Sequence, residues 1–236
     1  MRRTISLRNS WDKPIGAIDA AELACWVEIE RLGMPIGKQD QYASACGGLN
    51  TIEFSIDGVS ISPLHLPADV ITALGSRLLL FSTGQTHNSA AMLRQQQADT
   101  QTKRKTIESL HRIKALAEKM QEALLAEDLD RFGQLLDLGW REKRGLSKRV
   151  STAAIDSWYN AARKAGALGG KLVGAGGGGF LLLCCALHRQ DAVRATMASF
   201  GLREMTFDFD FTGARVLAAG ESGAYHTSQV LARDTR

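Results

Sequence analysis

The stretch KLVGAGGGGFLLLCC, residues 171–185, carries the clearest structural signal in this chain of 236 residues. Its last six residues are apolar, which predicts a buried strand over residues 180–187. A run of four glycines stands before them, and each glycine costs conformational entropy on folding. Such a run suits either close packing against another backbone or a loop whose bare N–H groups face an anion. The residues alone leave both interpretations open.

The same glycines match the pattern GxGxxG through Gly174, Gly176 and Gly179. A dinucleotide-binding loop needs a helix after the glycines, so that the pyrophosphate meets the helix N-terminus. Here a strand is predicted to follow. A Walker A loop ends in Gly-Lys-Ser/Thr, whereas Lys171 is followed by Leu172. A dinucleotide-dependent oxidoreductase is therefore the least favoured hypothesis.

Helical and strand patterns alternate around this stretch, which predicts an α+β chain. Helices are expected over residues 19–32, 88–126 with a break near 100–102, 128–144, 151–165 and 190–200. Strands are expected over residues 49–55, 59–66, 77–82, 180–187, 203–211 and 214–218. A capping box at Asp19, N-caps at Asp128 and Ser151, and a C-terminal Gly166 would bound three of the helices. The expected domain boundary lies near residues 67–76, after a β-hairpin.

Composition excludes several classes of protein. Hydrophobic residues make up 44% and charged residues 23%, a balance unlike that of a disordered chain. The longest uncharged stretch, residues 172–188, is interrupted by five glycines, so no membrane span is expected. The first 16 residues lack the apolar core of a secretion signal. We therefore expect a soluble, cytoplasmic protein.

The net charge of +4 is small for this length and suits an anionic substrate better than nucleic acid. The densest basic run, Lys103 to Lys105, is followed by Glu108 on the same expected helix, as on a solvated helix face. The four cysteines and five histidines have no zinc-site spacing. No metal-binding residues are therefore predicted, and the cysteines are expected to be free thiols.

The segment GKQDQ, residues 37–41, places the Asp40 carboxylate at the start of a short expected helix. Aspartate is favoured there because the helix dipole is positive at its N-terminus. The same carboxylate could instead take or orient the proton of a substrate hydroxyl, with Lys38 keeping it ionised. The spacing by itself favours the helix-end interpretation.

Taken together, GKQDQYASACGGLN (residues 37–50) and KLVGAGGGGFLLL (residues 171–183) resemble the GHMP superfamily of small-molecule kinases. Within it, the chain looks most like the D-glycero-D-manno-heptose 7-phosphate kinases. Further similarity lies in FSTGQTHNSA, FGQLLDLGWREKRGLS and the FDFDFTGARV segment. The resemblance extends over about residues 17–218.

The resemblance implies site residues. Asp40 matches the catalytic aspartate, which takes or orients the proton of the attacking sugar hydroxyl. The C-terminal glycine-rich motif, which packs against the ATP phosphate loop, matches Gly174, Ala175, Gly176, Gly177, Gly178 and Gly179. Substrate contacts are expected from Lys38, Gln41, Gly47, Gly48 and His87.

The resemblance also implies a fold and a reaction. Residues 1–70 would belong to an N-terminal domain of ribosomal-protein-S5-like type, residues 71–220 to a ferredoxin-like C-terminal domain, and residues 221–236 to a flexible tail. The reaction would move the γ-phosphoryl group of ATP, with Mg²⁺, onto the anomeric hydroxyl of the heptose 7-phosphate. That transfer gives a 1,7-bisphosphate. A fucose- or galactose-like sugar is the alternative substrate.

Two departures from the family pattern stand out. The principal phosphate loop, PxxxGLGSSA, is absent from the chain, and residues 1–16 contain no Gly-Ser loop. His87 stands where the heptose kinases would have an arginine. We therefore expect an N-terminally truncated kinase with exposed apolar surface around residues 17–66. Either its activity alone is negligible, or it is a non-catalytic remnant that binds a partner or nothing.

Overall fold

The computed structural model describes residues 15–85, 93–94, 97–100, 103–147, 150–174 and 176–215. His87, Ala175 and the expected tail at residues 221–236 lie outside this part of the chain. So do residues 216–218 of the last expected strand, while residues 214–215 are not in a strand.

The N-terminal part consists of helices followed by a hairpin. Its elements are α1 (Ala17–Cys25), the π-helix η1 (Trp26–Arg31), α2 (Gln39–Cys46), β1 (Asn50–Ser55) and β2 (Gly58–Pro63). The two strands pair antiparallel with Ser55 opposite Gly58, as the hairpin prediction required. A two-stranded sheet is marginal by itself. It is stabilised here by a small apolar cluster in which Ile52 and Ile61 pack against Tyr42 of α2.

Large apolar side chains remain exposed in this N-terminal part, as predicted. Trp26 is 50% exposed, Leu32 66% and Ile56, at the hairpin tip, 99%. The hydrophobic effect favours covering such surface.

The C-terminal part is built on a four-stranded sheet. Its elements are α3 (Ala68–Arg77), β3 (Leu78–Ser82), α5 (Arg104–Leu125), α6 (Leu129–Leu146), α7 (Ala153–Ala165), β4 (Ala167–Val173), β5 (Phe180–Cys185), η2 (Leu187–Arg189), α8 (Gln190–Ser199) and β6 (Arg203–Met205). The strand order is β4-β5-β3-β6, and all neighbours are antiparallel. This is the order of a ferredoxin-like sheet, so the predicted α+β class and C-terminal architecture are confirmed.

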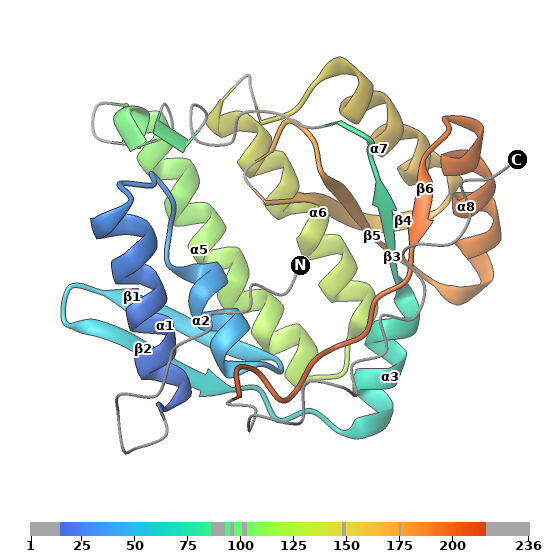
Figure 1. The fold of residues 1–236 in the computed structure, drawn as a ribbon. Coiled ribbons are helices and arrows are strands. Elements are labelled where there is room, and N and C mark those ends of the chain that lie inside the picture. The colour runs from blue at the N-terminus through green and yellow to red at the C-terminus, as the bar shows by residue number, and fades with distance from the viewer. Residues whose placement is uncertain are drawn as a thin grey trace, which may run out of the picture.

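Both faces of the sheet are covered by helices (Figure 1). On one face, β3 and β5 direct fully buried side chains such as Leu183 toward α7 and α8, where Ile155 and Val193 complete the main core. On the other face, the Cys184 thiol lies beneath Gly133 of α6. Adjacent residues of a strand point to opposite faces, which explains why both neighbouring cysteines are buried. All four cysteines are free thiols.

Strand β4 is not among the strands expected from the sequence. It contains Gly169 and Gly170, which weaken strand propensity and leave no apolar alternation to detect. Glycine is needed because α6 passes close to the sheet: a Cβ on Gly169 would lie 2.0 Å from the Gly133 carbonyl oxygen. A register shift between Ala167 and Gly169 turns Leu168 toward the same helix.

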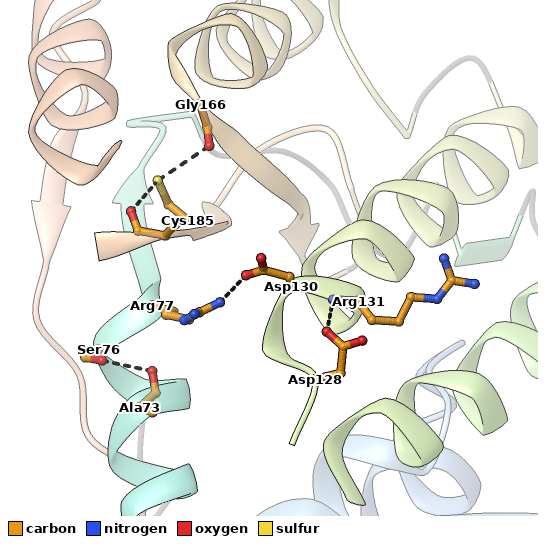
Figure 2. A network of polar contacts seen from close by, with 9 residues as sticks. Ala73, Ser76, Arg77, Asp128, Asp130, Arg131, Gly166 and Cys185 are labelled. Carbon is orange, nitrogen blue, oxygen red and sulfur yellow. Dashed lines mark hydrogen bonds and ion pairs between the residues drawn. The ribbon is translucent and has the colours of Figure 1, made fainter. Parts of the chain in front are cut away.

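The helix boundaries test the predicted caps. Asp128 accepts a hydrogen bond from the Arg131 N–H at 2.8 Å and begins α6, as predicted (Figure 2). Gly166 ends α7 at φ 119°, also as predicted. The cap of α7, however, is Thr152 and not Ser151, and the Asp19 box is wrong because α1 already begins after Gly16.

Helix α3 occupies the region near residues 67–76 where the domain boundary is expected. Its ten residues are too few for the apolar stripe to stand out in the sequence. At its end, Arg77 forms an ion pair with Asp130 in the first turn of α6 (Figure 2).

Residues 206–215, here called the strap, leave β6 and run back to the N-terminal part (Figure 1). The Asp210 carbonyl accepts from the Gly48 N–H at 2.7 Å, and the Ala214 N–H donates to the Ala45 carbonyl at 2.9 Å. The predicted strand over residues 203–211 is therefore wrong beyond Met205, because the backbone here bonds to the end of α2. The strap joins the C-terminal sheet to the helix that carries Asp40.

Replacing Gly213 by Ala is expected to release the strap from α2. Gly213 has φ +64°, and a Cβ there would lie 2.3 Å from the Ala45 carbonyl oxygen. Gly33→Ala is the matched control, because Gly33 has φ +60° with open space around it. Gly33→Ala should lower the free energy of unfolding by about 1 kcal/mol because alanine disfavours this backbone conformation. Gly213→Ala should lower it by about 1–3 kcal/mol more because of the clash. Urea unfolding measures both; equal losses would mean that the strap contact does not stabilise the fold.

Candidate functional site

Asp40 lies in the first turn of α2, and its side chain is exposed. No side chain caps this helix; the preceding residue, Lys38, occupies the N-cap position. A carboxylate there is stabilised by the unpaired N–H groups of the first turn. That position satisfies the helix-end interpretation and also leaves the carboxylate open to solvent and to a ligand.

Lys171 is the residue of the C-terminal sheet that Asp40 approaches. It lies on β4, half-buried, three residues before Gly174. Burial lowers the pKa of Lys171, and the negative charge of Asp40 acts against that lowering. The carboxylate is thus within electrostatic range of the ammonium group, although α2 and β4 are far apart in the sequence.

Lys143 reaches the same place from α6. Its Nζ donates a hydrogen bond to the Gly174 carbonyl at 2.6 Å. Burial, together with repulsion from Lys171, lowers the pKa of Lys143 to about 8. Three elements, α2, α6 and β4, therefore bring one carboxylate and two ammonium groups to the start of the glycine-rich segment.

The glycine-rich loop between β4 and β5 is held mainly by backbone contacts. The Gly177 N–H donates to the Val150 carbonyl at 2.9 Å, and the Gly179 N–H donates to the Gln85 carbonyl at 3.0 Å. A Cβ on Gly176, which has φ +118°, would lie 2.9 Å from the Val150 carbonyl oxygen. Close packing therefore explains the absence of a side chain at Gly176. The N–H groups of Gly177 and Gly179 already have protein partners and do not face an anion.

The remaining expected substrate residues divide into two groups. Lys38 lines a shallow groove of about 540 Å³ between the start of α2 and the hairpin tip. Gln41 is buried and donates through Nε2 to Glu28, while Gly47 and Gly48 hold the strap. Gln41, Gly47 and Gly48 therefore make packing contacts within the protein, whereas the exposed Lys38 is accessible to a ligand.

Sequence analysis missed Lys143 and Lys171 as site residues. Lys171 stands inside the glycine-rich motif, so its position was visible, but a lone lysine there gave no reason to select it. Lys143 stands among other charged residues near the end of α6, where charges usually mark a solvated face. Only the packing of α6 on β4 brings the two together.

Comparisons with known proteins find similar kinases. Residues 120–201 match the family GHMP kinases C terminal. Over 164 residues the chain is 36% identical to the D-glycero-alpha-D-manno-heptose 7-phosphate kinase of Campylobacter jejuni subsp. jejuni serotype O:2, an alignment covering 69% of this chain. It covers 48% of that enzyme, so the chain spans about half the length of the curated relative it matches.

Solved structures show the same fold. A D-glycero-D-manno-heptose 1-phosphate kinase from Bacteroides thetaiotaomicron superposes with a TM-score of 0.57 at 27% identity, covering 87% of this chain and 57% of that one. A structure from Campylobacter jejuni described as a sugar kinase gives a TM-score of 0.62 at 32% identity, covering 85% and 56%.

Proposed function

Because this chain carries the C-terminal domain of the GHMP kinases, at residues 120–201, we propose that it serves ATP-dependent phosphorylation of a sugar or sugar phosphate. The observation that carries the proposal is that Asp40, exposed at the start of α2, lies within electrostatic range of Lys171 on β4, next to the glycine-rich loop. A kinase needs an acceptor base and a phosphate site side by side, since phosphoryl transfer depends mainly on positioning and charge stabilisation.

Asp40 is proposed as the group that accepts or orients the proton of the attacking hydroxyl. Its exposure leaves room for a sugar, and it lies within electrostatic range of the Lys171 ammonium group. The glycine-rich loop supports the phosphate side through its backbone packing on Val150.

The favoured acceptor is D-glycero-D-manno-heptose 7-phosphate, phosphorylated on its anomeric hydroxyl to the 1,7-bisphosphate. The name of the Campylobacter relative supports this choice. The Bacteroides relative is named a 1-phosphate kinase, so the position of the phosphate on the acceptor needs a direct test. A screen of heptose phosphates, fucose and galactose, with the phosphorylated carbon identified by NMR, separates these acceptors.

ATP and Mg²⁺ are the proposed donor and cofactor, and the residues present fit part of that requirement. The two lysines at the loop suit a polyphosphate. Mg²⁺ usually keeps several waters and is held by one or two carboxylates together with substrate phosphates. The described residues contain no cluster of three metal-ligating side chains, so this chain would share the ion with the phosphates. When bound, the ion would neutralise charge on the transferring group.

We propose that residues 1–70 form the N-terminal kinase portion and residues 71–220 the C-terminal domain. Separate apolar clusters around Tyr42 and around Trp140 support the division, while a third cluster, which contains Leu124, packs against Leu64 and joins the two portions. Sugar and nucleotide would lie between the two portions, which the strap connects.

Within the described residues, no helix is both long and apolar enough to cross a membrane.

The polypeptide of these 236 residues is expected to bind heptose 7-phosphate and MgATP but to turn over at a negligible rate. The PxxxGLGSSA motif, which supplies N–H groups to the nucleotide, is absent from its sequence. Losing a single well-placed donor costs about 3 kcal/mol in a transition state. Isothermal titration calorimetry measures both affinities, and a coupled assay of ADP release measures the rate.

Two outcomes would change the proposal. If the folded polypeptide binds neither heptose 7-phosphate nor MgATP, the result would favour a non-catalytic remnant of a kinase. A rate of about 1–100 s⁻¹, normal for a kinase, would support the kinase function and contradict the expected loss of activity.

A further inference from the structure

The ammonium groups of Lys143 and Lys171 repel each other near the start of the glycine-rich loop, and no carboxylate of the described residues is bonded to either. Lys143 of α6 donates to the Gly174 carbonyl at 2.6 Å, and Lys171 lies on β4, three residues before Gly174. Among the described residues, neither lysine forms an ion pair within 4.0 Å. Asp40 acts on Lys171 from a longer range.

Some other cations of this domain are paired with carboxylates. Arg112 of α5 pairs with Glu142 at 2.9 Å, and Arg194 pairs with Glu204 at 2.9 Å. Glu142 is the immediate neighbour of Lys143 on α6, yet its carboxylate is bonded to Arg112 and Ser109. The carboxylate nearest to Lys143 in the sequence is therefore already engaged.

This arrangement costs free energy in the absence of a ligand. Burial disfavours an ammonium group, and a second ammonium nearby disfavours it further, as the pKa of Lys143 of about 8 reflects. An anion placed between the lysines would remove the repulsion. Unpaired cations in a partly buried site are typical of sites that receive a negative ligand.

We propose that Lys143 and Lys171 together form a phosphate-binding site at the start of the glycine-rich loop. The inference rests on the proposed function, because it names the groups that hold a phosphate beside Asp40. The shared ligand chemistry is a phosphate dianion, which can come from the nucleotide polyphosphate or from the 7-phosphate of the sugar.

The geometry suggests how each lysine contributes. An ammonium group has three N–H donors, and the bond to Gly174 uses one of those on Lys143 and fixes its position. Two donors remain for phosphate oxygens. Lys171, whose charge is favoured by Asp40, supplies the second cation. The site would hold a phosphate within reach of the carboxylate that handles the acceptor hydroxyl.

The test measures binding of MgATP, heptose 7-phosphate and inorganic pyrophosphate to the intact chain by calorimetry at pH 7. Lys143→Met and Lys171→Met remove the charge with little change of size, and the exposed Lys164 on α7 gives the control Lys164→Met. Charge-assisted hydrogen bonds contribute enough that each site variant should weaken the phosphate ligand by about 10- to 100-fold. Lys164→Met should bind as the wild type does, and Lys171→Arg should retain most of the affinity.

A proton measurement separates binding from a purely structural role. An anion raises the pKa of Lys143, so at pH 8 the wild type should take up protons on binding, as seen by comparing buffers of different ionisation enthalpy. The uptake should fall sharply in Lys143→Met. The ligand whose affinity depends on the lysines, ATP or the sugar phosphate, identifies the source of the phosphate.

The outcomes distinguish this inference from the proposed function. If MgATP or the sugar phosphate binds and both Met variants bind it as tightly as the wild type, the lysine site is wrong and the kinase function stands. Pyrophosphate bound in a lysine-dependent way, with neither substrate bound, would support the site and count against the kinase. No binding of any probe by the wild type would overturn the inference. Should Lys143→Met fail to fold, Lys171→Met decides by the same criteria.

Discussion

Replacing Asp40 by Asn is expected to lower sugar-dependent phosphoryl transfer by about 10²–10⁴-fold, the usual contribution of a general base. The amide keeps the size of the side chain but cannot accept the hydroxyl proton. Asp40 is exposed at the start of α2 and has no hydrogen bond to lose among the described residues, so the fold should be preserved. Transfer of radiolabelled γ-phosphate from ATP to heptose 7-phosphate, followed at high protein concentration, detects the low rates involved.

The control for this substitution is Asp57→Asn, at the exposed turn of the β1–β2 hairpin. It removes the same charge from the same part of the chain and should leave the rate unchanged. The Kd for MgATP should change by about twofold or less in both variants, because the proposed role of Asp40 lies on the acceptor side. A rate in Asp40→Asn equal to that of the wild type would remove Asp40 from the proposed role.

Replacing Gly169 by Ala is expected to destabilise the protein strongly, because the added methyl group has no space. The new Cβ would lie 2.0 Å from the Gly133 carbonyl oxygen and 2.7 Å from the Asp137 backbone nitrogen. Both are backbone atoms of α6, which cannot rotate away as a side chain can. Helix and strand must separate, and overpacking of this kind costs about 3 kcal/mol.

Gly139→Ala is the matched control, because Gly139 lies on the same helix with nothing within 4 Å of the added methyl group. Alanine favours the helix interior over glycine, so this variant should be more stable by about 1 kcal/mol. Thermal unfolding should show a Tm lowered by about 6–12 °C for Gly169→Ala and raised slightly for Gly139→Ala. Equal Tm values for Gly169→Ala and the wild type would mean that α6 does not pack directly on β4.

Local patterns in the sequence predicted a large part of the fold. The apolar run after the glycine-rich stretch forms β5, the residues Asp57 and Gly58 lie at the turn of the hairpin, and Asp128 is the N-cap of α6. In each case the cause lies within a few residues: burial of a continuous apolar strand, a turn conformation, or a side chain bonded to a nearby N–H. The motifs at residues 37–50 and 171–183 indicated the kinase family for the same reason, because each is contiguous.

Other features could not be predicted because their causes lie in contacts between distant segments. Strand β4 has glycines where a strand usually has β-branched residues, and only the close approach of α6 explains them. The strap leaves the sheet because its backbone bonds to the end of α2.

The sequence by itself determined the α+β class, most element positions and the kinase resemblance, including Asp40 as the expected base. Only the tertiary structure decided what surrounds that carboxylate. In the sequence Lys143 resembles a solvated helix charge and Lys171 a lone lysine in a glycine-rich stretch; the packing of α6 on β4 and the position of α2 bring them into one site. Charges far apart in the chain interact only after the core has formed, so their pairing is a property of packing and not of spacing.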